Sequence, residues 1–231
     1  MQTLSKGSSA QVYWEDLVFL EAALLASPDT AALAGAVTEV LGEYEGLQAR
    51  KLAVRRAQIQ ARARASVADA LLDGGLRSLR NAALFLVQHR RDDPAYRALF
   101  KGTLEDEIKH ALRRQVEVAQ QKVDALSLQL FDEAFRQANR PGLVALVEQG
   151  RAVLQSVREA GLGAADHKLT EDAWKDEVAA VRQAVYGQLM TLGAQKGLGK
   201  KWANAFFDGG LSGLEDPNAQ PSAPAPEPEP A

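Results

Sequence analysis

Apolar residues recur at three- and four-residue steps along almost the whole of this 231-residue chain, and no segment shows the apolar–polar alternation of a strand. The clearest series follows Asp29 and consists of Leu33, Val37, Val40, Tyr44 and Leu47. Such a seam lies on one face of a helix and packs against neighbouring helices. The sequence therefore predicts an all-α protein, an elongated antiparallel helical bundle with long helices.

Capping residues and glycines predict where the helices of the first half begin and end. Ser8 with Gln11 matches a capping box and opens a first helix. A second helix covers residues 29–72, where Gly42 and Gly46 are the weak points. This stretch is predicted to form either one rod of roughly 60 Å, at about 1.5 Å per residue, or two helices that break at those glycines.

The rest of the chain carries the same kinds of signal. Asp93 and Pro94 predict the N-cap and first turn of a short helix, because proline lacks the N–H that a first turn leaves unused. Thr103 predicts the cap of a longer helix over residues 103–138, and further helices are predicted over residues 141–160 and from 170 to the glycines at 193, 197 and 199. The stretch GLGAADHK, residues 161–168, is predicted to be a loop, and KKWANAFFDG a short terminal helix.

The chain is predicted to have a flexible N-terminus (1–8), a helical bundle (9–210) and a disordered, proline-rich, acidic tail (211–231). A weak internal repeat is visible within the bundle. FLEAALLAS at 19–27 resembles FDEAFRQAN at 131–139, and ALFKG at 98–102 resembles AFFDG at 205–209. Two similar halves, 9–102 and 103–210, would explain both matches, but alanine- and leucine-rich helices also match one another by chance.

Composition narrows the class of protein. The chain has no cysteine, which excludes disulfides, thiolate metal sites and cysteine nucleophiles. The N-terminus lacks the apolar stretch of a signal peptide, and no window approaches the length of a membrane span. We expect a cytoplasmic protein without a transmembrane segment. A net charge of −3 disfavours a dedicated nucleic-acid binder.

The stretch ARKLAVRRAQIQARARA, residues 49–65, contains cations and no acid. Its candidate binding residues for nucleic acid or another anion are Arg50, Lys51, Arg55, Arg56, Arg62 and Arg64. At about 100° per residue these side chains scatter around a helix, and no aromatic residue lies among them to stack on a base. Residues 1–45 carry seven acids and one lysine. We therefore expect neutralisation within the protein or its oligomer, with nucleic acid or an anionic membrane surface as alternatives.

Other candidate motifs are weak. Glu107 and His110 have the Glu-x-x-His spacing of di-iron bundles, but those sites need a second copy and further carboxylates, so no metal and no cofactor are predicted. The glycine-rich stretch 193–201 has the wrong spacing for a phosphate loop and is interpreted as a helix end. The aromatic residues Trp202, Phe206 and Phe207 either close one end of the bundle or dock a partner.

These observations favour a non-enzymatic helical structural or protein-interaction protein that acts through its bundle faces and tail. A protein partner or self-association is expected. The alternatives are an accessory binder of nucleic acid or of an anionic surface through residues 50–64, and a metal carrier or enzyme built in the bundle.

Overall fold

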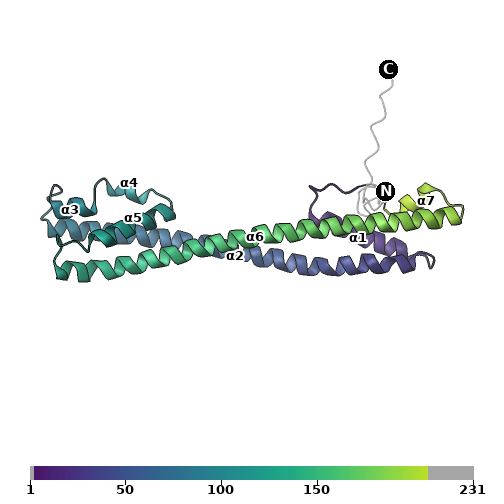
Figure 1. The fold of residues 1–231 in the computed structure, drawn as a ribbon, viewed down its shortest axis with the longest axis horizontal. Helices are drawn as coiled ribbons and strands as arrows, with labels where there is room; N and C mark the ends of the chain where they lie inside the picture. The colour runs from purple at the N-terminus through teal and green to yellow at the C-terminus, as the bar shows by residue number, and fades with distance from the viewer. Residues whose placement is uncertain (1–2, 208–231) are drawn as a thin grey trace, which may run out of the picture. The chain divides into compact units, whose positions relative to one another are not determined.

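The computed structural model describes residues 3–207, and of Leu104 and Glu107 only the backbone. In chain order the elements are α1 (Ala10–Leu25), η1 (Ala31–Leu33), α2 (Ala34–Leu86), α3 (Pro94–Leu99), α4 (Leu104–Ile108), α5 (Leu112–Ala125), α6 (Glu133–Gln195) and α7 (Lys200–Ala205) (Figure 1). The described residues contain no strand, and the long helices α2 and α6 pack against each other. The predicted all-α helical bundle is therefore confirmed. The predicted tail, 211–231, lies outside the described residues.

The chain divides into two compact units. Within the described residues, unit 1 comprises residues 3–47 and 171–207, and unit 2 comprises residues 48–170. Both long helices contribute to both units. This division rests on contacts in space and does not test the predicted repeat, so the halves 9–102 and 103–210 remain a prediction. No helix in the described part of the chain has the length and apolar character needed to cross a membrane.

Unit 1 has its own hydrophobic core, formed by α1, α7 and the parts of α2 and α6 that belong to this unit. Leu17, Leu20 and Leu24 of α1 are fully buried in it. Trp174 of α6 packs against Tyr13 and Tyr44, and its indole Nε1 donates a hydrogen bond of 3.1 Å to the carbonyl of Val40. That bond satisfies the polar group of an otherwise apolar side chain and fixes its orientation.

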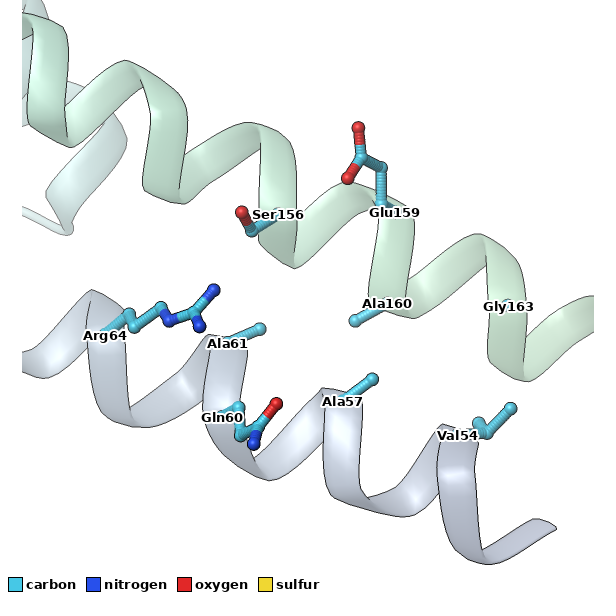
Figure 2. Close-up of a pocket in the computed structure, with 9 residues that line it drawn as sticks. All are labelled: Val54, Ala57, Gln60, Ala61, Arg64, Ser156, Glu159, Ala160 and Gly163. Atoms are coloured by element: carbon cyan, nitrogen blue, oxygen red, sulfur yellow. The ribbon is translucent and has the colours of Figure 1, made fainter. Parts of the chain in front are cut away.

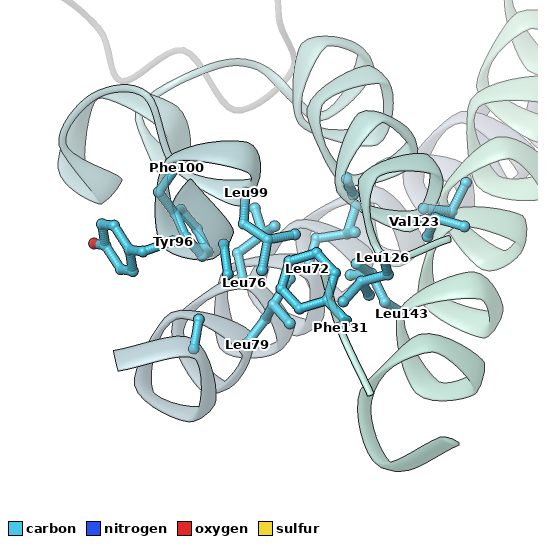
Figure 3. Packing of buried hydrophobic residues seen from close by; sticks show 14 of the residues in the cluster. Leu72, Leu76, Leu79, Tyr96, Leu99, Phe100, Val123, Leu126, Phe131 and Leu143 are labelled. Carbon is cyan, nitrogen blue, oxygen red and sulfur yellow. The ribbon is translucent and has the colours of Figure 1, made fainter. Parts of the chain in front are cut away.

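Unit 2 has a separate core to which α2, α3, α5 and α6 all contribute. Figure 3 shows Leu72 and Leu76 of α2 packing with Leu126, Phe131 and the aromatic residues of the α3 end. Its deeply buried polar side chain is Gln115, whose Nε2 donates to Asp73 at 2.9 Å and to the carbonyl of Ile108 at 2.8 Å. These bonds satisfy the amide nitrogen of Gln115 and the carbonyl at the end of α4.

The predicted helix starts at Asp93 and Thr103 are confirmed, and the predicted start at Ser8 is wrong. Asp93 caps α3 by accepting from the backbone N–H of Ala95 at 2.9 Å, with Pro94 as first helical residue, and Thr103 caps α4. The cap of α1 is Ser9 and not Ser8, since the Ser9 hydroxyl accepts from the N–H of Val12. The side chains of Ser8 and Ser9 are equally suited to this role. Ser9 is the cap because its backbone has the extended conformation that an N-cap needs.

Helix α2 is continuous over 53 residues, so neither Gly42 nor Gly46 breaks it. It also passes the predicted stop at residues 73–75, because Leu76 and Leu79 beyond it are buried in the core of unit 2. It ends where Gln88 and His89 adopt positive φ angles of 52° and 64° and the N–H of His89 donates to the carbonyl of Leu84 at 2.7 Å. This is a left-handed helix termination formed without glycine.

The predicted helix over 103–138 is wrong. The chain instead forms α4 and α5 and then reverses over residues 126–132. Leu126 and Phe131 are buried in the core of unit 2, and the carboxylate of Asp132 accepts from the N–H of Phe135 at 2.7 Å to cap α6. Burial of these two side chains outweighs the tendency of the local sequence to form a helix, which is all that summed residue propensities measure.

The predicted break at Pro141 and the predicted loop at 161–168 are also wrong, because α6 runs for 63 residues through both. A proline inside a helix costs about 3 kcal/mol and an interior glycine about 1 kcal/mol. Leu143 and Val147, which follow Pro141 in α6, are buried in the core of unit 2. Along 161–168, α6 lies against α2 and buries His167. Tertiary packing therefore sustains the helix where its local sequence opposes it.

Gly150 of α6 sits where three helices approach closely. A Cβ atom on Gly150 would lie 2.5 Å from Cγ2 of Val116 in α5 and 3.3 Å from Cδ1 of Leu72 in α2. A distance of 2.5 Å between carbon atoms is far inside van der Waals contact. The glycine is therefore required by packing, despite its poor helix propensity.

We expect Gly150→Ala to be less stable than Gly142→Ala by about 2 kcal/mol in denaturant unfolding, because overpacking costs about 1–3 kcal/mol whereas an exposed glycine gains about 1 kcal/mol on becoming alanine. Gly142 is the matched control, since it lies in the same helix with nothing within 4 Å of the added atom. Equal midpoints for the two variants would show that Val116 moves aside without cost.

Candidate interaction surface

Residues 48–68 of α2 and 152–170 of α6 form a two-helix segment of unit 2, which we call the helix pair. Neither hydrophobic core cluster includes a residue of this segment among its buried members. The helices touch through small side chains instead, and Ala61, Ala68 and Val153 are buried between them. The outer surfaces of the pair are thus largely open to solvent.

One side of the helix pair holds a groove of about 310 Å³ (Figure 2). Its lining residues are Val54, Ala57, Gln60, Ala61 and Arg64 from α2 and Ser156, Glu159, Ala160 and Gly163 from α6. Near the same side, the guanidinium of Arg50 pairs with the carboxylate of Asp166, 116 residues away in sequence. This side, the groove side, therefore carries both signs of charge.

The predicted anion-binding residues all lie exposed on α2 within the helix pair. Arg50 has the carboxylate of Asp166 as its partner. Among residues 3–207, the structure gives no ion pair to the remaining five, Lys51, Arg55, Arg56, Arg62 and Arg64. Within the described chain, the expected neutralisation is thus found at Arg50 alone. Neutralisation between copies remains a prediction.

Helix geometry places three of these cations, Lys51, Arg55 and Arg62, together on the side opposite the groove. Residues two apart on a helix point about 160° away from each other. Arg55 and Arg62 each precede a groove residue, Ala57 and Arg64, by two positions. Lys51 lies within about 40° of both around α2. We call the surface formed by Lys51, Arg55 and Arg62 the cationic side.

Helix α6 adds to this surface, which sequence analysis of residues 50–64 alone could not detect. Lys168 follows the groove-side residue Asp166 by two positions and so lies on the cationic side. Arg158 lies at the outer edge of α6. Arg158 and Lys168 are visible in the sequence as cations. Only the alignment of α6 with α2, which the Arg50–Asp166 pair shows, relates them to Arg55 and Arg62.

Large aliphatic side chains are exposed along both outer edges of the helix pair. Leu52 and Ile59 of α2 have 71% and 56% of their surface exposed, and Leu162 and Leu169 of α6 have 65% and 70%. The members of each pair are seven residues apart, so each pair lies on one face of its helix. These exposed apolar edges flank the cationic side.

The aromatic residues near the end of the described chain pack inside unit 1. Phe206 and Phe207 are buried and Trp202 is partly buried. Trp202 contacts Phe206 edge-on at 5.1 Å between ring centroids, and Tyr186 contacts Phe207 at 5.6 Å. Core packing accounts for these residues without a partner, and their role in docking remains a prediction.

The other motifs show no assembled chemistry. Helix α4 ends at Ile108, so His110 lies beyond it and lacks the helical spacing to Glu107 that the di-iron motif requires; the side chain of Glu107 is outside the description. No cluster of metal-ligating side chains occurs among the described residues. The glycine-rich stretch ends α6, with Gly197 at φ +69° and the N–H of Leu198 donating to Gly193 at 2.7 Å.

Unit 1 contains a larger hollow, of about 710 Å³, beside α1. Apolar residues such as Val12, Val18 and Phe19 line it together with Asp16 and Arg182. The guanidinium Nε of Arg182 lies 2.7 Å from Oδ2 of Asp16, and both side chains are largely buried. Burial raises the pKa of Asp16 above its ordinary value, while the charge of Arg182 and its hydrogen bond oppose that rise.

No protein-family model matches this chain, and no match is found among curated proteins or solved structures. The structure itself defines an all-α protein in which long helices pack against each other. Function has to be inferred from its surfaces.

Proposed function

We propose that this chain is a non-enzymatic helical interaction protein, and that the cationic side of the helix pair binds an anionic partner. The observation that supports this most directly is the exposure of Lys51, Arg55 and Arg62 without an ion pair in the described chain. Rigid helices hold these charges in a fixed arrangement. A preorganised set of like charges binds a complementary surface with little loss of backbone entropy.

The charge of the whole protein does not account for such binding. The net charge is −3, so a polyanion would be repelled by the average surface and attracted only by a local cationic one. Two copies meeting through their cationic sides would repel each other for the same reason. The partner surface must therefore be acidic.

Self-association through opposite charges is a second candidate. Glu39, Glu43 and Glu45 of unit 1 are exposed, and the structure gives them no ion pair among residues 3–207. The acidic surface of one copy could then receive the cationic side of another. Sedimentation at low and high salt tests this, because such a dimer should dissociate as salt screens the charges.

Binding to immobilised heparin tests the proposed function. At pH 7.5 and low salt we expect the protein to be retained despite its net negative charge, and the triple variant Lys51→Gln/Arg55→Gln/Arg62→Gln to elute at clearly lower salt. The physical reason is that each cation that contacts a polyanion releases condensed counterions, so fewer contacts mean weaker and less salt-dependent binding.

The matched control is Arg97→Gln/Arg113→Gln/Arg140→Gln, which removes the same charge from exposed positions away from the helix pair. It should elute as the unmodified protein does. If both triple variants shift equally, or if the unmodified protein is not retained, the helix pair is not a specific anion-binding surface and the proposed function is wrong.

A further inference from the structure

We infer that the anionic partner is a membrane surface rich in anionic lipid, on which the helix pair lies with its cationic side down. This inference rests on the proposed function and specifies its partner. It depends on a second property of the same surface, the exposed aliphatic side chains, which binding to a simple polyanion would leave unused.

The apolar residues and the cations occupy neighbouring strips of α2. At about 100° per residue, Leu52 and Ile59 lie about 20° apart, and Ile59 lies about 40° from Arg55. More than half of the surface of both aliphatic side chains is exposed, although each lies in a well-formed helix. Helices that lie in the interface of a bilayer carry lysine and arginine on a polar face and aliphatic residues on the other face, and Arg55 and Ile59 lie where two such faces of α2 meet.

On α6 the aliphatic residues again lie beside a cation, Arg158, at the outer edge of the helix. Arg158, Leu162 and Leu169 fall within about 40° around the helix axis. The cationic side is therefore bordered by an aliphatic edge on each helix. In a bilayer interface the cations would meet lipid phosphates, and the leucine and isoleucine side chains would enter the boundary of the acyl chains.

The same features argue against nucleic acid. A phosphate backbone would satisfy Lys51, Arg55 and Arg62 but offers no apolar surface to Leu52 or Ile59. Tight binding of single strands also depends on aromatic residues that stack on bases, and the helix pair contains none. A lipid surface uses both the charge and the apolar edges, so it accounts for more of the structure.

Vesicle co-sedimentation tests the inference. The probes are neutral phosphatidylcholine vesicles, vesicles with about 30 mol % phosphatidylglycerol and short duplex DNA. We expect binding to the anionic vesicles, much weaker binding to the neutral ones, and weaker binding to DNA than to the anionic vesicles. The Lys51→Gln/Arg55→Gln/Arg62→Gln variant should bind anionic vesicles about 100-fold more weakly at low salt.

A second variant separates lipid insertion from charge alone. Leu52→Gln/Ile59→Gln should weaken binding to anionic vesicles roughly tenfold, because burial of the aliphatic groups is lost, while leaving elution from heparin unchanged. Its control is Leu128→Gln/Leu130→Gln, which alters two exposed leucines outside the helix pair. This control should bind both probes as the unmodified protein does.

The outcomes distinguish the two proposals. Retention on heparin without binding to anionic vesicles would overturn the membrane inference and leave the proposed function standing. Unchanged vesicle binding by Leu52→Gln/Ile59→Gln, or tighter binding to DNA than to anionic vesicles, would also overturn the membrane inference. If the unmodified protein binds neither heparin, nor DNA, nor anionic vesicles, both proposals are wrong.

Discussion

Replacing Arg182 with methionine should lower the free energy of unfolding by about 3–5 kcal/mol, the usual cost of leaving one partner of a buried ion pair uncompensated. Arg182 is buried in unit 1, with its Nη2 donating to Oδ1 of Asp16 at 3.1 Å and its Nε 2.7 Å from Oδ2. Methionine keeps much of the volume but cannot neutralise the carboxylate. Urea unfolding monitored by circular dichroism measures the effect.

The double variant Asp16→Leu/Arg182→Met provides the control. Removing both charges should restore stability to within about 2 kcal/mol of the unmodified protein, because apolar replacements of a buried pair are often neutral. If the double variant is as unstable as the single one, the loss comes from packing around Arg182, including its contact with the ring of Phe207, and not from the charge of Asp16.

The deficit of Arg182→Met should also depend on pH. Burial already raises the pKa of Asp16 above 3.8, and Arg182 is the group that holds it down. Without Arg182 the folded-state pKa rises further. A carboxyl whose pKa is higher in the folded state binds protons more readily there, so stability should increase as the pH falls through the folded pKa toward 3.8. Unfolding at pH 7 and pH 5 should therefore show a smaller deficit at pH 5.

Leu72→Ala should cost about 2–5 kcal/mol, since it removes a fully buried side chain from the core of unit 2 and leaves a cavity. Leu52→Ala, the same substitution in the same helix, should change stability by no more than about 0.5 kcal/mol, because 71% of the Leu52 surface is exposed. Chemical denaturation of both variants gives the comparison.

A similar loss of stability in Leu72→Ala and Leu52→Ala would contradict the placement of Leu52 on an exposed outer edge of the helix pair. It would mean that Leu52 is buried in solution by another surface. In that case a concentration-dependent midpoint for the unmodified protein would identify a second copy as that surface.

Local signals predicted part of this structure correctly. The apolar periodicity predicted the all-α class, and Asp93, Pro94 and Thr103 predicted the starts of α3 and α4. These features succeed because helix caps and seams involve residues within one or two turns of each other. Their energetics are therefore present in the local sequence, whatever the chain does elsewhere.

The lengths of the helices could not be predicted in the same way. Pro141 and the glycines at 161 and 163 are strong local breakers, yet α6 continues through them. In contrast, residues 126–132 contain no proline or glycine and nevertheless form the reversal between α5 and α6. Burial of Leu126, Phe131 and Leu143 in one core decides the reversal and the passage through Pro141, and packing of α6 against α2 sustains the helix through the glycines. Both effects depend on residues distant in sequence.

The candidate surface shows the same division. The sequence by itself determined that residues 50–64 are strongly cationic and helical. Only the tertiary structure decided that Arg50 meets Asp166 across the groove side, whereas Arg55 and Arg62 point to the opposite side with Lys168. The reason is that the pairing of two helices is set by side chains more than 100 positions apart, such as Arg50 and Asp166, 116 residues from each other. A periodic pattern within one helix carries no information about that register.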